Sequence, residues 1–302
     1  MTKNNLTYKI RQNREKRAIN LAGDILEAAG LLTAPIDLLA LVKQESPWLV
    51  VKSGNFKDSF DGRLEYHATH DRFILFYNNK YGLNDFIPGA HHQRTRFTIA
   101  HELGHFYLDE HRAFLIRKGQ AHSSTSEFVA DDVIEREADA FAAGLLMPDR
   151  LIRPLVNQGE LTAKRIKGFA THFNTSCVSA TIRSVLVSDF PCAVVAVRNG
   201  LITWCFSSNA LIEAQCYPLP QGPLKSPSAI KQWQAFSTGH EIEEELCAAS
   251  NNWFRCYGPV YNTFMVSEYF LPVPKMDMLL ILISVSEQDI LSFYDEEIDS
   301  ME

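Results

Sequence analysis

The sequence lacks any apolar run of the roughly 18 residues that a membrane-spanning helix requires. Its polar start, Met1 to Arg17, also lacks the apolar core of a secretory signal peptide. We therefore expect a cytoplasmic protein that makes no membrane contact. With 302 residues, of which 46% are hydrophobic, the chain can still bury a substantial core, and we expect it to divide into two or three units.

Cysteine is scarce as well. The six cysteines form no C-x-x-C pair, and in a reducing compartment we interpret them as small core residues rather than as redox sensors. All of them lie in the second half of the chain, at Cys177, Cys192, Cys205, Cys216, Cys247 and Cys256.

Basic residues are absent from the end of the chain. After residue 286 there are seven acidic residues and no Lys or Arg, which accounts for the whole formal net charge of -7. We expect this end to be a frayed, solvated tail. The first twenty residues instead hold six basic residues against Glu15 alone, a pattern that we interpret as the exposed face of a helix rather than as a nucleic-acid contact.

The stretch from Thr98 to Tyr107 contains the pattern H-E-x-x-H, with His101, Glu102 and His105 at its fixed positions. In a helix, two histidines four residues apart stand one turn apart on the same face, so both imidazoles can bind one metal ion. Glu102 then lies beside the ion without being a ligand. Zinc in such a site activates a water, and a neighbouring carboxylate accepts its proton as the water attacks a carbonyl. The pattern therefore predicts peptide hydrolysis.

A third ligand has to come from elsewhere, and the sequence offers three candidates. A second predicted helix, Val133 to Pro148, carries Glu135 and Asp139 four residues apart. Glu135 would ligate the metal, while Asp139 accepts a hydrogen bond from a ligand histidine and fixes its tautomer. We favour Glu135 over Glu137, and place His111 third because the glycine of the longer zinc pattern that it would complete is missing. Such ligands suit zinc, with manganese as the alternative.

The two motifs together, His101 to His105 and Glu135 to Pro148, resemble those of the ImmA/IrrE family of bacterial metallopeptidases. Phe60-Asp61-Gly62 and the stretch Arg96 to Ala100 fit the same family. The resemblance implies an α+β fold with a zincin-like, gluzincin-like metallopeptidase domain of helices and a small mixed sheet. It also implies that the protein substrate is a helix-turn-helix transcriptional repressor, in a stress, DNA-damage or mobile-element and defence response.

We predict three parts: a metallopeptidase domain at 1–149, a helical helix-turn-helix-like segment at 150–188 and a C-terminal domain at 189–302. An exposed strand edge in the first part can pair with an extended peptide. Hydrophobic periodicity in this part predicts two helices, at about 14–29 and from 35 onward, and three strands, at 48–51, 62–66 and 72–77.

Two polar segments interrupt these patterns. The stretch from Lys118 to Ser126 has no periodicity, so we predict a loop, and its place between the two ligand-bearing helices makes it a candidate lid. In the second part, a short polar turn separates a helix over 161–173 from a helix that begins at 178, which is typical of a helix-turn-helix. We expect this pair to brace the peptidase core, and DNA contact is the weaker expectation.

The C-terminal part is predicted to be sheet-based. Apolar runs on both sides of Asn199-Gly200 predict a hairpin, with further strands near 261–269 and 278–284 and helical turns near 228–236. The family resemblance implies a GAF-like α/β sensor domain, whose signal ligand is unknown. Two functions follow: a regulated protease that cuts a repressor, or alternatively a non-proteolytic regulator that binds DNA or a partner protein. Glu102 favours the first, because a binding scaffold needs no general base.

Overall fold

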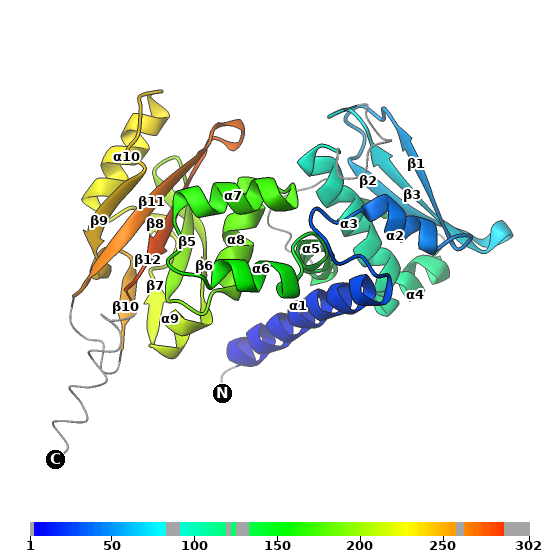
Figure 1. The fold of residues 1–302 in the computed structure, drawn as a ribbon, viewed down its shortest axis with the longest axis horizontal. Helices are drawn as coiled ribbons and strands as arrows, with labels where there is room; N and C mark the ends of the chain where they lie inside the picture. Colours follow the sequence, from blue (N-terminus) through cyan, green and yellow to red (C-terminus); the bar gives the residue numbers. More distant parts are fainter. Residues whose placement is uncertain (1–2, 83–90, 119–121, 125–132, 258–262, 287–302) are drawn as a thin grey trace, which may run out of the picture. The chain divides into compact units, whose positions relative to one another are not determined.

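The computed structural model describes residues 3–82, 91–118, 122–124, 133–257 and 263–286. Within these residues the chain forms ten α-helices, three 3-10 helices and twelve strands in three sheets, which confirms the predicted α+β class (Figure 1). It divides into two compact units, residues 1–151 with 171–176 and residues 152–170 with 177–302. The three-part division stays a prediction. No helix among the described residues is long and apolar enough to cross a membrane.

The first unit combines helices with a small sheet, and helix α6 (Asp149–Val156) begins in it and continues into the second unit. Its other elements are α1 (Lys3–Ala28), α2 (Leu38–Gln44), β1 (Leu49–Gly54), β2 (Gly62–His67), the 3-10 helix η1 (Ala68–His70), β3 (Arg72–Asn78), α3 (Gln93–Tyr107), α4 (Asp109–Lys118), β4 (His122–Ser124) and α5 (Val133–Leu146).

The sheet of the first unit has the strand order β1-β3-β2-β4. Strands β1 and β3 run parallel, whereas β2 pairs antiparallel with β3 and with β4, so the sheet is mixed. The side chains of Phe73, Leu75 and Tyr77 are buried, as the period of two in a half-buried strand requires. The three predicted strands are confirmed. The predicted loop at 118–126 is wrong at β4, because His122–Ser124 pair with Gly62–Leu64.

Helices α1, α3 and α5 pack together beside this sheet. Along α1, the apolar residues Ala18, Ala22 and Leu26 recur every four positions and are fully buried, which places them on one face of the helix. Glycines permit close helix contacts: a Cβ on Gly104 of α3 would lie 3.1 Å from the Ala138 Cα of α5. The two helices on which the predicted ligands lie are therefore held at short range.

The second unit is built on a six-stranded sheet. Its helices are most of α7 (Ala163–Phe173), α8 (Cys177–Val187), α9 (Asn209–Glu213) and α10 (Pro227–Ser237), with the 3-10 helices η2 (Ser250–Asn252) and η3 (Pro274–Met276). Its strands are β5 (Cys192–Arg198), β6 (Leu201–Ser207), β7 (Cys216–Pro218), β8 (Gly222–Pro223), β9 (Glu245–Ala249), β10 (Phe254–Cys256), β11 (Met265–Val273) and β12 (Met278–Ser284).

This sheet has the order β8-β6-β5-β12-β11-β9 and is antiparallel throughout, while β7 and β10 form a separate two-stranded sheet. The predicted hairpin is confirmed: Asn199 and Gly200 have φ values of 51° and 72°, which suit a tight turn between β5 and β6. Every residue of β12 is buried. Helix α10 packs against β11 and β12, and α8 packs against β5 and β6 (Figure 1).

Helices α7 and α8 form the predicted helix pair. In a DNA-reading pair the second helix exposes side chains to the major groove. Here α8 packs against β5 and β6, and its Thr181 and Arg183 are buried. This burial disfavours DNA reading by these two residues, and the bracing of the peptidase core stays a prediction. The acidic tail predicted after residue 286, and the predicted lid apart from residues 118 and 122–124, lie outside the described residues.

Candidate metal centre

The centre is built on α3, which holds the two histidines of the H-E-x-x-H pattern. His92 caps the start of the helix, because its Nδ1 accepts a hydrogen bond from the Arg94 amide at 3.2 Å, and Leu108, which has an extended backbone, follows its last residue. His101 and His105 are both buried, and their Nε2 atoms lie 3.1 Å apart. Both imidazoles therefore lie on one face of the helix with their Nε2 atoms close together, as the sequence predicts.

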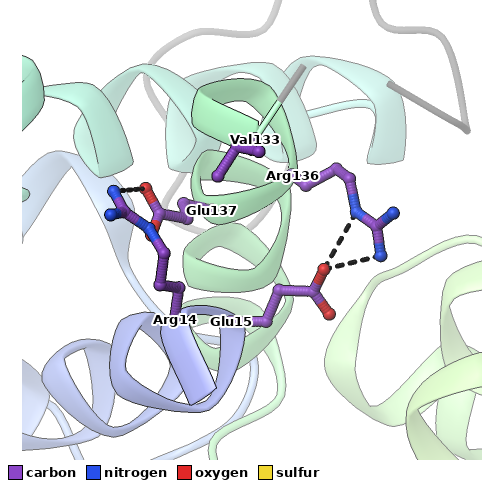
Figure 2. Close-up of a pocket in the computed structure, with 5 residues that line it drawn as sticks. All are labelled: Arg14, Glu15, Val133, Arg136 and Glu137. Atoms are coloured by element: carbon purple, nitrogen blue, oxygen red, sulfur yellow. Dashed lines mark hydrogen bonds and ion pairs between the residues drawn. The ribbon is translucent and has the colours of Figure 1, made fainter. Parts of the chain in front are cut away.

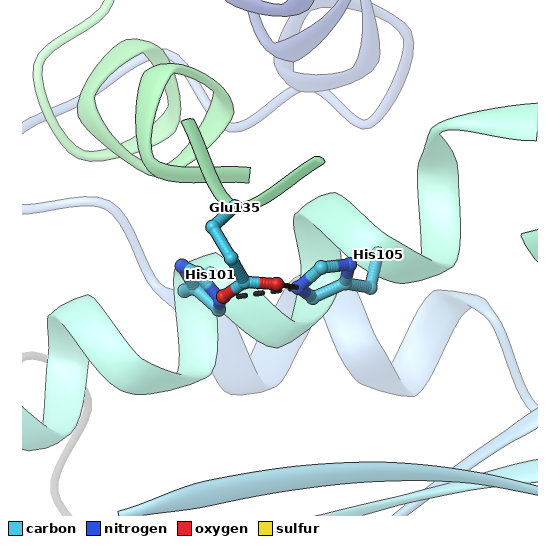
Figure 3. A group of neighbouring side chains, drawn as sticks. All are labelled: His101, His105 and Glu135. Carbon is cyan, nitrogen blue, oxygen red and sulfur yellow. Dashed lines mark hydrogen bonds and ion pairs between the residues drawn. The ribbon is translucent and has the colours of Figure 1, made fainter. Parts of the chain in front are cut away.

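Helix α5 brings a carboxylate to the same point (Figure 3). Glu135 Oε2 lies 3.3 Å from His101 Nε2, and Glu135 Oε1 lies 3.6 Å from His105 Nε2. Three ligand atoms bound tetrahedrally to zinc, with bonds of about 2.0–2.1 Å, would be separated by about 3.3–3.4 Å. The observed separations match this requirement. The three side chains therefore form a group that can hold a metal ion, and within the described residues it is the one such group of histidine, cysteine and acidic residues.

The outward-facing nitrogens of both histidines have partners. His101 Nδ1 lies 2.8 Å from Asp139 Oδ1, and His105 Nδ1 lies 3.1 Å from His111 Nδ1. A histidine that binds a metal through Nε2 carries its proton on Nδ1, so His101 donates to Asp139 and His105 donates to His111. His111 Nδ1 must then be an acceptor, which leaves the proton of neutral His111 on Nε2. These tautomers are assigned from the hydrogen-bond pattern.

The proton on Nε2 of His111 also has an acceptor. His111 Nε2 lies 3.0 Å from Glu137 Oε2. Glu137 also receives two hydrogen bonds from Arg14 of α1, through Nε and through Nη2, the latter at 2.9 Å (Figure 2). Arg14 Nη2 contacts Glu110 at 2.7 Å, and the neighbouring Glu15 accepts a hydrogen bond from Arg136. Glu137 is thus engaged at both oxygens by α1 and His111, away from the metal group.

The protonation of these groups follows from burial and charge. Burial would raise the pKa of Glu137, but hydrogen bonds from Arg14 and His111 outweigh it and lower that pKa. Burial lowers the pKa of His111 despite the neighbouring Glu137. The pair is therefore a carboxylate beside a neutral imidazole, as the tautomers above require. This chain of contacts runs from α1 through Glu137 and His111 to the outer nitrogen of His105.

The centre itself attracts positive charge. Burial alone would lower the pKa of His101, but hydrogen bonds to Asp139 and Glu135 and the charge of Glu102 raise it to about 10. A proton on His101 is stabilised here because several carboxylates surround one small volume. The same electrostatic field favours a divalent cation, and proton and metal would compete for the site.

Glu102 is fully buried between α3 and β2. Its position depends on Gly62, since a Cβ at residue 62 would lie 2.6 Å from Glu102 Oε1 and 2.5 Å from the Thr98 methyl carbon. The neighbouring Asp61 anchors β2 to the start of α3, because its Oδ2 accepts hydrogen bonds from Arg94 at 3.0 and 2.7 Å. Asp61 and Gly62 therefore hold β2 against the carboxylate that the sequence predicts as general base.

The structure brings together His101, His105 and Glu135, with Asp139 behind His101. His111 lies behind His105 rather than among the three grouped side chains, and Glu137 faces Arg14. Sequence reasoning did not identify Arg14, which is 123 positions from Glu137, and it assigned no role to Gly62. No local pattern marks such residues, because only the packing of α1 against α5 and of β2 against α3 brings them to the centre.

This geometry describes an α+β protein in which two helices carry a group of side chains that could hold a metal ion. Residues 88–184 match the family model described as the IrrE N-terminal-like domain, peptidase M78. This part of the chain is thus similar to the IrrE-like peptidases, and the resemblance to the ImmA/IrrE family is confirmed. The matched region contains the predicted site residues His101, Glu102, His105 and Glu135.

A similar fold occurs among solved structures. A Mycobacterium tuberculosis transcriptional regulator matches with a TM-score of 0.54 and 14% sequence identity, over 91% of this chain and 79% of that chain. At this identity the likeness shows the fold alone. No curated protein matches the chain at a significant level.

Proposed function

We propose that the protein is a regulated, zinc-dependent endopeptidase with His101, His105 and Glu135 as metal ligands and Glu102 as general base. The observation that carries the proposal is the convergence of the two Nε2 atoms and the Glu135 carboxylate at distances of 3.1, 3.3 and 3.6 Å. The donor set of two imidazoles and one carboxylate suits zinc, and manganese is the alternative. When bound, zinc would supply Lewis acidity and a water whose pKa is lowered to about 7.

The chain's own residues hold and move protons around this centre. Asp139 and His111 keep the protons of the ligand histidines on Nδ1, so the Nε2 lone pairs point inward. Arg14 keeps Glu137 ionised and able to accept the His111 proton. Glu102, buried on the same helix, can accept a proton at its carboxylate and return it to the departing amine of a cleaved peptide.

The proposed substrate is a helix-turn-helix transcriptional repressor, cleaved in the cytoplasm during a stress, DNA-damage or mobile-element and defence response. The match of residues 88–184 to the IrrE N-terminal-like domain supports this proposal. The structural relative from Mycobacterium tuberculosis is described as a transcriptional regulator, which also fits a regulatory role. For the C-terminal part, 189–302, we propose a GAF-like sensor that binds a signal ligand and controls cleavage.

The decisive experiment compares the natural protein with Glu102→Gln. The purified full-length chain, loaded with zinc, is incubated with the repressor encoded beside its gene, and cleavage is followed by gel and mass spectrometry. Replacement of Glu102 by glutamine keeps the size and removes the base. We expect zinc content to be unchanged and cleavage to fall by at least ~100-fold.

The matched control is Glu27→Gln, because the Glu27 side chain is 72% exposed and lies on α1. This variant should cleave at the natural rate. Full cleavage by Glu102→Gln would refute the assigned base. Tight repressor binding without cleavage by the natural, zinc-loaded protein would instead support the non-proteolytic regulator that binds DNA or a partner protein.

A further inference from the structure

The second unit contains two cysteines in contact, neither of which takes part in the candidate metal centre. Cys216 begins β7 and Cys256 ends β10, and the two residues stand directly opposite each other in the antiparallel ladder. Their sulfur atoms are 2.6 Å apart. Opposed residues of antiparallel strands have Cα atoms about 4.5–5.5 Å apart, which lies within the range that a disulfide spans.

We propose that Cys216 and Cys256 are a modification site at which peroxide forms a reversible disulfide. A disulfide bond is about 2.05 Å long, so the sulfur atoms have to approach by only about 0.5 Å, and the strand register is kept. The bond would link β7 to β10 across a separation of 40 positions in the sequence. This proposal goes beyond the proposed peptidase activity and does not depend on it.

The two thiols differ in a way that assigns their roles. Cys216 is fully buried in the core of the second unit, whereas Cys256 is partly exposed. The Cys216 thiol donates a hydrogen bond to Cys256 Sγ, which lowers the pKa of Cys256 and raises that of Cys216. Because the thiolate is the nucleophile, Cys256 is the thiol that attacks the oxidant and Cys216 the thiol that resolves the product.

The reaction balances in two steps. The Cys256 thiolate attacks one oxygen of hydrogen peroxide, the O–O bond breaks, and a sulfenic acid and one water form after proton uptake. Cys216 then loses its proton and attacks the Cys256 sulfur, which forms the S–S bond and releases the second oxygen as water. Two thiols are oxidised by two electrons, and one peroxide is reduced to two waters. A dithiol reductant reverses the bond by exchange.

The other cysteines provide internal comparisons. Cys247 is exposed, and burial raises the pKa of Cys192 to about 11, so Cys192 is a poor nucleophile at neutral pH. The described residues include all six cysteines, and in that set the sulfur atoms of Cys216 and Cys256 are the one pair in contact. Disulfide formation should therefore be confined to this pair at low peroxide.

The full-length protein is treated with hydrogen peroxide under native conditions, remaining thiols are blocked, and peptides are mapped by mass spectrometry. We expect two of the six thiols to disappear, with loss of the mass of two hydrogen atoms and a cross-linked peptide pair that contains Cys216 and Cys256. Dithiothreitol should restore both thiols. In Cys216→Ser the sulfenic acid at Cys256 should persist and be trapped by dimedone, while the matched control Cys247→Ser should form the disulfide like the natural protein.

Retention of all six thiols at peroxide concentrations that oxidise free glutathione would overturn the proposal. A disulfide between any other pair of cysteines, with Cys216 or Cys256 still reduced, would also overturn the proposal. Trapping at Cys247 instead of Cys256 in Cys216→Ser would overturn the assigned roles. The thiol count on the natural protein requires no variant, metal or substrate, so its outcome is separate from that of the proposed peptidase activity.

Discussion

At the scale of single residues, hydrogen bonds distinguish the two neighbouring glutamates of α5. Glu137 lies two positions after Glu135 on α5, yet its oxygens accept hydrogen bonds from Arg14 and His111. Glu135 is the carboxylate that remains beside His101 and His105. The proposal of Glu135 rather than Glu137 as the ligand, which helical spacing alone leaves open, therefore depends on the contact of Glu137 with Arg14 on the first helix.

This arrangement predicts different results for two conservative substitutions. Glu135→Gln replaces a charged ligand by a neutral amide and should release most of the metal. Glu137→Gln should weaken metal affinity by about 10- to 100-fold, because it only removes the acceptor that orients His111. Zinc content after dialysis and competition with a chelator measure both effects. Greater metal loss from Glu137→Gln than from Glu135→Gln would show that the ligand assignment is wrong.

A second prediction at this scale concerns pH. Burial would raise the pKa of Asp61, but its hydrogen bonds and ion pairs with Arg94 and Lys80 outweigh burial and lower it. A carboxylate with a lowered folded pKa contributes stability that is present above its unfolded pKa of about 3.9 and is lost as pH falls through the folded value.

Asp61→Asn should therefore reduce the free energy of unfolding by about 1–2 kcal/mol at pH 7, allowing for the partial exposure of Arg94. The difference from the natural protein should persist down to about pH 5 and shrink below pH 4. Urea denaturation at several pH values measures it. Asp58→Asn is the matched control, because Asp58 also contacts Lys80 at 3.2 Å but is 98% exposed, and its effect should stay within about 0.5 kcal/mol.

At the scale of elements, the close approach of β2 to α3 places the buried Glu102. Strand β2 has no side chain at Gly62, and the Glu102 carboxylate and the Thr98 methyl group occupy the space where a Cβ would stand. The proposed ligands, in contrast, lie on α3 and α5, whose contact runs through Gly104 and Ala138. The proposed base and the proposed ligands are therefore positioned by different pairs of elements.

Gly62→Ala should consequently impair cleavage without impairing metal binding. The added methyl group displaces Glu102 or β2, so we expect cleavage to fall at least ~10-fold while zinc content changes little. Gly82→Ala is the matched control, because no atom lies within 4 Å of the added Cβ there. Equal loss of zinc and cleavage in Gly62→Ala would mean that the substitution disrupts the whole centre.

At the scale of the whole molecule, the chain has two compact units with separate hydrophobic cores. The metal group lies entirely in the first unit, since its residues are His101, His105 and Glu135. A ligand that binds only the folded form of one unit stabilises that unit by mass action. Metal should therefore change the stability of one unit and leave the other unaffected.

Thermal unfolding followed by calorimetry is expected to show two transitions. Removal of metal with a chelator should lower the midpoint of one transition by about 5–10 °C and leave the other within about 1 °C. Peroxide should change the midpoint of the other transition if the Cys216–Cys256 disulfide forms. A single transition that shifts as a whole would contradict this prediction.

The sequence by itself determined the local elements of this protein. The helix that carries His101 and His105, the second helix with Glu135 and Asp139, the three strands at 48–77 and the hairpin at Asn199-Gly200 all follow from short-range periodicity and turn chemistry. These features depend on residues within a few positions of one another, so a linear pattern is enough to predict them.

Only the tertiary structure decided which of these residues meet. It separated Glu135 from Glu137 through Arg14, put His111 behind His105, brought Gly62 against Glu102 and placed Cys216 opposite Cys256. It also paired β4 with β2, where polar composition predicted a loop. Each of these contacts joins residues far apart in the chain, and their proximity arises from the packing of helices and strands, which no local pattern encodes.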